Sequence, residues 1–209
     1  SAFIELVGVM DRLRTDCPWD REQTHRSLAR YLLEETHETL EAIDTGDYEH
    51  LREELGDLLL QILFHARIAD DFGIDEVSAD LVDKLVRRHP HVFAGAPADD
   101  LDATWEQMKQ AEKGRTSVTD GVPMGQPALS LAAKLQKRGA RVGVPVPSYD
   151  GVGGELWALV ARCRAEGLDP EVELRRVARD YRDRLAAIEA ELLAEGTGPA
   201  SLTEEDWLA

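Results

Sequence analysis

The chain has 209 residues, of which 43% are hydrophobic and 31% are charged, a composition typical of globular proteins and not of disordered ones. Its formal net charge of −17 disfavours nucleic acids and anionic membrane surfaces as partners, because both repel an acidic protein. The two cysteines, Cys17 and Cys163, have neither zinc-site spacing nor a disulfide pattern, and no apolar run approaches the roughly 18 residues that span a membrane, so we expect a cytoplasmic protein without a membrane segment.

Hydrophobic residues recur at helical spacing along the first half, and strand signals are weak, so the sequence predicts an all-α fold. The expected helices cover residues around 3–13, 24–43, 48–70 and 75–88, and a further one carries Trp105, Met108 and Lys109. Between the first two helices, the Cys-Pro-Trp-Asp segment at 17–20 is expected to form a loop. Residues 55–66 are apolar nearly all round, which predicts a helix enclosed by other helices.

Residues 114–127 are rich in Gly, Pro, Ser and Thr and are expected to form a linker. Helical spacing returns over 128–137, 156–165 and 171–193, whereas the Gly- and Pro-rich residues 143–154 are expected to be irregular. The sequence therefore predicts two helical parts, residues 1–113 and 128–209, joined by the linker.

The second part faintly repeats the first. Residues 154–156 (GEL) resemble residues 56–58 (GDL), and residues 167–169 (GLD) resemble residues 73–75 (GID). The repeat is incomplete, because no acidic helix precedes Glu155.

Two of the predicted helices carry acidic residues that share one helix face. Glu35 and Glu38 lie one turn apart, and Glu54 and Asp57 lie one turn apart on the next helix. Two adjacent helices can therefore aim four carboxylates at one point, and Mg²⁺ prefers such oxygen ligands together with substrate phosphates. The alternative is a solvated acidic face, which is the interpretation that we favour for Glu41, Glu49 and Glu53.

Asp57 lies beside the apolar residues 58–60, where burial of an unpaired carboxylate would cost several kcal/mol. A metal ion, or a Lys or Arg, must offset that cost. The sequence has no P-loop, no Rossmann glycine pattern and no nucleophile elbow, so a phosphate site here would consist of metal ions and side chains. Glu34 and His37 have the spacing of di-iron ligands, but the second ExxH motif that such a site needs is absent.

Basic and aromatic residues follow the acidic helices. Lys84 and Arg88 lie one turn apart on one predicted helix, and Trp105 and Lys109 lie one turn apart on the next. Lys and Arg suit phosphate oxygens, and a Trp ring suits a nucleobase or a cation. The alternative is a solvated helix end for the two cations and a core position for the tryptophan.

These motifs together resemble the MazG family, within the all-α nucleoside triphosphate pyrophosphatases that include dimeric dUTPases. The resemblance covers residues 1–113. It rests on the segments CPWD at 17–20, EExxE at 34–38, ExxD at 54–57, KLVRRHPHVF at 84–93 and WExxK at 105–109.

The resemblance implies a helical bundle assembled as a homodimer and hydrolysis of nucleoside triphosphates to monophosphate and pyrophosphate, canonical or non-canonical, in nucleotide-pool house-cleaning. It implies Mg²⁺ held by Glu35, Glu38, Glu54 and Asp57. It implies substrate contacts from Glu34, Lys84, Arg88, Trp105 and Lys109. A carboxylate not fully occupied by metal would take the proton of the attacking water, and our candidates are Glu34 and Glu38.

Two-domain members of the family carry a second copy, which residues 122–143 resemble at its start. The chain then departs from the pattern, because the second EExxE helix is missing. We therefore expect residues 128–209 to be a degenerate copy without a complete metal site. The alternative for the whole protein is a non-catalytic helical dimerisation or regulatory module, which release of pyrophosphate with and without Mg²⁺ would distinguish.

Overall fold

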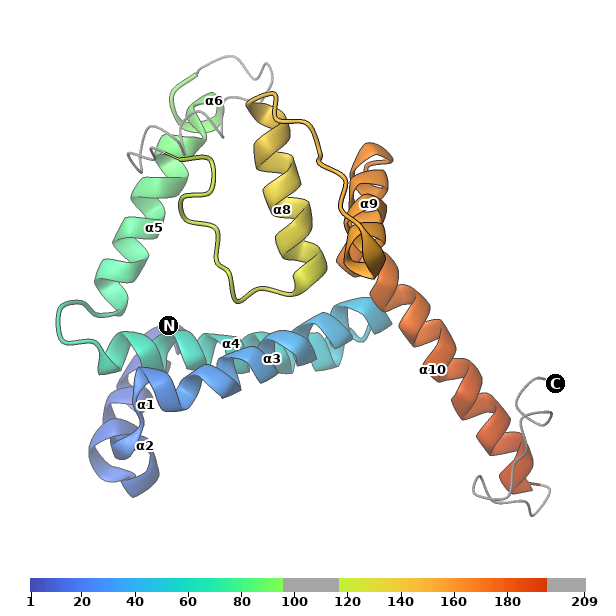
Figure 1. Ribbon diagram of the computed structural model, residues 1–209. Coiled ribbons are helices and arrows are strands. Elements are labelled where there is room, and N and C mark those ends of the chain that lie inside the picture. The colour runs from blue at the N-terminus through green and yellow to red at the C-terminus, as the bar shows by residue number, and fades with distance from the viewer. Residues whose placement is uncertain (96–116, 195–209) are drawn as a thin grey trace. The chain divides into compact units, whose positions relative to one another are not determined.

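A computed structural model describes residues 1–95 and 117–194 of the chain (Figure 1). All regular secondary structure in these two ranges is helical, which confirms the all-α prediction. Among the residues that the structure describes, none of the helices is both long and apolar enough to cross a membrane. The chain divides into two compact units, Ser1–Met108 and Lys109–Ala209, and each unit is described by itself.

The first unit is a set of helices whose ends agree with the predicted ends of the three central helices to within two residues. They are α1 (Ala2–Asp16), α2 (Pro18–Glu22), α3 (His25–Thr45), α4 (Tyr48–Ile68), α5 (Ile74–Arg88) and α6 (Pro90–Phe93). The loop predicted at 17–20 is wrong, because this segment begins the short helix α2. Pro18 occupies its first position, where the missing N–H has no helical partner to lose.

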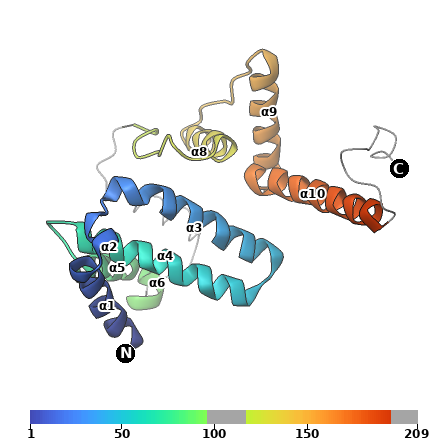
Figure 2. The same ribbon diagram turned by 90° about the horizontal axis from the view of Figure 1, so that it is seen from below.

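Local signals fix both ends of the α3–α4 connection. Thr24 caps α3: its hydroxyl accepts a hydrogen bond from the backbone N–H of Ser27 at 3.1 Å. Gly46 ends α3 in the left-handed conformation, at φ +72°, which glycine adopts at little cost. Asp47 then accepts hydrogen bonds from two backbone N–H groups in the first turn of α4. As a result α3 and α4 run antiparallel and lie side by side (Figure 2).

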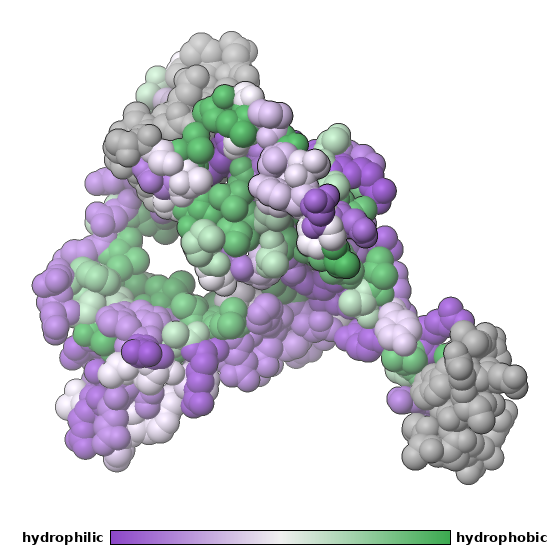
Figure 3. Space-filling view, viewed as in Figure 1, coloured by the Kyte–Doolittle hydropathy of each residue, from purple (hydrophilic) through white to green (hydrophobic). Residues whose placement is uncertain are grey.

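The hydrophobic core of this unit lies between α1, α3 and α4. Its buried members are Met10, Leu28, Leu63 and Phe64. The prediction that other helices enclose residues 55–66 is correct for Leu63 and Phe64 and wrong for Leu55 and Ile62, which are 53% and 47% exposed. Figure 3 shows hydrophobic residues along the α3–α4 pair. No helix of residues 1–95 covers this face of α4.

The second unit contains α8 (Ala128–Arg141), α9 (Gly151–Ala165) and α10 (Pro170–Ala194). The irregular stretch predicted at 143–154 is wrong for its last four residues, because α9 begins at Gly151. Packing overrides the low helix propensity of glycine there. Gly154 is buried, and an ideal Cβ on it would lie 1.8 Å from the carbonyl oxygen of Tyr149. The first turn of α9 therefore requires a residue without a side chain.

This close approach predicts opposite effects for two neighbouring substitutions. Gly154→Ala should destabilise the second unit by about 1–3 kcal/mol, because the new methyl group overlaps backbone. Gly153→Ala should stabilise it by about 0.5–1 kcal/mol, because nothing lies within 4 Å of that Cβ position. Thermal unfolding followed by circular dichroism measures both changes. Equal effects of the two substitutions would contradict the packing of Gly154.

Candidate metal centre

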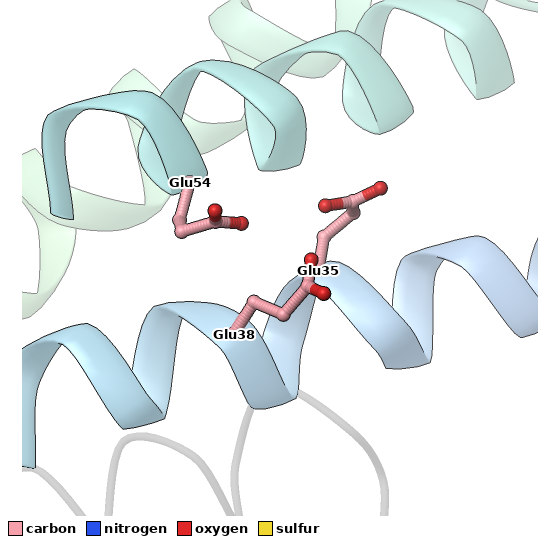
Figure 4. Close-up of side chains that lie close together, drawn as sticks. All are labelled: Glu35, Glu38 and Glu54. Atoms are coloured by element: carbon pink, nitrogen blue, oxygen red, sulfur yellow. The ribbon is translucent and has the colours of Figure 1, made fainter. Parts of the chain in front are cut away.

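Three carboxylates converge between α3 and α4. Glu35 and Glu38 extend from α3, and Glu54 extends toward them from α4 (Figure 4). Each contributes an oxygen, and these oxygens lie within 4.8 Å of one another. The helical spacing places the first two residues one turn apart, and the antiparallel pairing places the third opposite them. The structure thus brings together three of the four residues that the sequence nominated as metal ligands.

Glu54 is the most constrained member of the group. The residue is only 6% exposed. Its Oε1 atom lies 2.9 Å from Nε2 of His50, one turn earlier on α4. Its Oε2 atom is buried and has no hydrogen-bond partner among the described residues. A buried carboxylate oxygen without a partner is costly, so the position of Glu54 fits a cation beside Oε2.

Glu35 shows the electrostatic consequence of this crowding. Its pKa is raised from 4.5 to about 7, first by burial and then by the negative charges of Asp57, Glu38 and Glu54. Near neutral pH the carboxyl group of Glu35 therefore carries a proton part of the time. A bound cation would displace that proton. Asp57 acts on Glu35 through its charge, although none of its oxygens belongs to the group of three within 4.8 Å.

The chemistry of the donors indicates which cation fits. All three ligand candidates are carboxylates, and none is a Cys or His. Hard divalent cations such as Mg²⁺ and Mn²⁺ prefer this oxygen set, whereas zinc and copper favour nitrogen and sulfur. His50 does not join the group but holds Glu54 in place, the role that residues behind a ligand often have. His50 was not predicted from the sequence, although its spacing of four residues from Glu54 on one helix was a usable signal.

The remaining predicted site residues are elsewhere or outside the described residues. Glu34 is exposed on α3. Lys84 and Arg88 are half-buried on α5, which extends away from the α3–α4 pair (Figure 1), so they do not belong to the carboxylate group. Trp105 and Lys109 lie outside the residues that the structure describes. The substrate contacts assigned to these residues stay a prediction.

The comparisons with known proteins agree on one family. The profile of the MazG nucleotide pyrophosphohydrolase domain matches residues 23–93, the range of α3, α4, α5 and α6. The nucleoside triphosphate pyrophosphohydrolase of Mycobacterium tuberculosis is 42% identical, over 99% of this chain and 67% of the relative. The nucleoside triphosphate pyrophosphohydrolase/pyrophosphatase MazG of Thermotoga maritima is 36% identical, over 93% and 88%. An uncharacterised 26.1 kDa protein of Streptomyces cacaoi is 49% identical, over 90% and 83%.

The raised pKa of Glu35 predicts a pH-dependent stability of the metal-free chain. A carboxyl group with a higher pKa in the folded than in the unfolded chain favours folding most below its unfolded pKa, and this contribution is lost as the pH rises. The loss should occur between about pH 4.5 and about pH 7. Glu35→Gln, which stays neutral, should therefore melt at a higher temperature than the wild type above this window.

The melting temperatures of both chains, measured in EDTA across the window, test this expectation. The difference between them should grow as the pH rises and then level off. Added Mg²⁺ should raise the melting temperature of the wild type above the window more than that of Glu35→Gln. A difference that does not change with pH would contradict the crowding of the carboxylates.

Proposed function

The chain belongs to the MazG nucleotide pyrophosphohydrolase family, and from this premise we propose that it hydrolyses nucleoside triphosphates to monophosphate and pyrophosphate with Mg²⁺ as cofactor. Named relatives at 36% and 42% identity support the activity. The observation that carries the proposal is the group of Glu35, Glu38 and Glu54, with a buried oxygen of Glu54 that lacks a partner. A helical scaffold without a ligand would gain nothing from this crowding.

Mg²⁺ held by these three residues and Asp57 would neutralise negative charge on the phosphate oxygens. The chain's own side chains have three further tasks: one orients a metal ligand, one releases a proton, and one accepts the proton of the attacking water. His50 keeps the Glu54 carboxylate oriented, and Glu35 releases its proton as the site fills. A water attacks the α-phosphorus, the bond from that phosphorus to the bridging oxygen breaks, and pyrophosphate leaves with the bond electrons. The proton of the water passes to the exposed carboxylate of Glu34 or Glu38.

The substrate itself would be bound by side chains outside the carboxylate group. We assign phosphate contacts to Lys84, Arg88 and Lys109, a contact with the base to Trp105 and a further substrate contact to Glu34. Cationic side chains suit phosphate oxygens, and an aromatic ring suits a base. House-cleaning of the nucleotide pool in the cytoplasm is the role that we propose for this activity.

A homodimer would complete this arrangement. Leu55 and Ile62 on α4 and Leu81 and Leu85 on α5 are each more than 40% exposed. Each pair shares a helix face, and apolar faces of this kind mark interaction surfaces. A second copy of the first unit would bury them, and it could bring the cations of its α5 toward the carboxylates. We propose that residues 128–209 contribute no metal site, since Glu155 is exposed and no acidic helix precedes it.

Removal of one ligand tests the catalytic proposal. Glu54→Gln should reduce Mg²⁺-dependent release of pyrophosphate by at least about 100-fold, because a buried ligand charge is lost. EDTA should abolish the activity of the wild type. Glu53→Gln is the matched control, since Glu53 is the exposed neighbour of Glu54, and it should retain full activity. Activity of Glu54→Gln close to that of the wild type at saturating Mg²⁺ would disprove the site.

Removal of a cation tests the substrate contacts. Lys84→Ala should weaken transition-state binding by about 2–4 kcal/mol, which is a loss of about 30- to 1,000-fold in kcat/KM. Circular dichroism should be unchanged. Arg26→Ala, at an exposed position on α3, serves as the control and should have wild-type kinetics. Loss of helix content together with activity in Lys84→Ala would assign a structural role to Lys84.

A further inference from the structure

The second unit contains a cavity of about 640 Å³ between α8 and the turn that joins α9 to α10. It lies within this unit alone, and none of its lining residues belongs to the carboxylate group of the first unit. Small-molecule sites commonly have volumes of roughly 300–1,000 Å³. The cavity therefore has room for a ligand of the size of a nucleotide.

Three cationic side chains line this cavity. Lys134 and Lys137 lie one turn apart on α8, and Arg164 lies in the last turn of α9. Within the described residues, none of the three forms an ion pair with a carboxylate. The Nε atom of Arg164 is buried without a hydrogen-bond partner there. A ligand in the cavity cannot reach this buried Nε atom, so an anion there would contact the terminal nitrogens of the guanidinium group.

The acidic groups beside the cavity have other partners. Asp169 lines the cavity, and its Oδ1 atom accepts hydrogen bonds at 2.9 and 3.2 Å from backbone N–H groups in the first turn of α10. Glu171 accepts hydrogen bonds from the backbone N–H and the hydroxyl of Ser130 at 3.3 and 3.4 Å. These two carboxylates stabilise the first turns of α10 and α8. Their negative charges remain, so among the described residues the three cations leave an excess of one positive charge at the cavity, in a chain whose net charge is −17.

A smaller cavity in the first unit shows that an excess of positive charge is not a general property of cavities between the helices of this chain. It has about 210 Å³ and lies between α1, α4 and the start of α5. Most of its lining is apolar, and Arg67 in its wall is paired with Asp11. Its cation is thus paired within the first unit, whereas no carboxylate among the described residues forms an ion pair with Lys134, Lys137 or Arg164.

We propose that the cavity of the second unit binds a phosphate-bearing small molecule without a divalent metal. Lys134, Lys137 and Arg164 contact the phosphate oxygens, because Lys and Arg suit such groups. Leu168 and Pro170 form an apolar wall, against which the ring of a nucleoside monophosphate lies. The site does not depend on the proposed catalytic activity, because no residue of the carboxylate group takes part.

Calorimetric titration of the full chain in EDTA with AMP, inorganic pyrophosphate and inorganic phosphate tests this proposal. AMP should bind at one site per chain, and more tightly than inorganic phosphate. Arg164→Gln should weaken AMP binding by about tenfold or more, because a charge-assisted hydrogen bond is lost. Arg162→Gln is the matched control: Arg162 lies on the same helix, is paired with Glu166 and does not line the cavity, so binding should be unchanged.

Other outcomes decide between the parts of the proposal. Glu54→Gln should bind AMP as the wild type does in EDTA, which separates this cavity from the metal centre. If Arg164→Gln does not fold, Lys137→Ala should show the same weakening. Equal affinity for AMP and inorganic phosphate would overturn the contact between the ring and the apolar wall. No binding of any of the three ions in EDTA, or binding lost in Glu54→Gln and kept in Arg164→Gln, would overturn the site.

Discussion

Two packed helices of the first unit hold carboxylates close together against their mutual repulsion. The properties of the proposed metal site depend on this constraint. Glu35, Glu38 and Glu54 would move apart in a flexible chain, but the core between α1, α3 and α4 and the glycine turn at Gly46 keep them together. The raised pKa of Glu35 is the result of that confinement. A bound cation would relieve the repulsion, so rigid packing and the proposed metal binding would support each other.

Much of this arrangement could be predicted from local patterns. Hydrophobic spacing located α3, α4 and α5, and helical geometry placed Glu35 and Glu38 on one face. Two local elements were missed for physical reasons. Proline at the first position of α2 begins a helix as readily as it breaks one. The start of α9 depends on the contact between Gly154 and the Tyr149 carbonyl, which no helix propensity contains.

Features that depend on tertiary structure could not be predicted from the sequence. Helical spacing predicts that Asp57 shares a helix face with Glu54. Whether the Asp57 carboxylate meets the other three depends on its side-chain rotamer and on the cation. The cavity of the second unit joins Lys134 and Lys137 to Arg164, which is far from them along the chain. In the two proposed sites, opposite charges would serve one class of ligand. The first unit would bind phosphates through a metal held by carboxylates, and the second would bind phosphates directly through Lys and Arg.

A crystal structure of the chain with Mn²⁺ in place of Mg²⁺, measured near the manganese absorption edge, tests the central claim most directly. Mn²⁺ shares the preference of Mg²⁺ for carboxylate oxygens. We expect an anomalous peak between α3 and α4, in contact with oxygens of Glu35, Glu38 and Glu54, with Oε2 of Glu54 among the ligands. A fully occupied peak at another position, or an empty carboxylate group at saturating Mn²⁺, would contradict it.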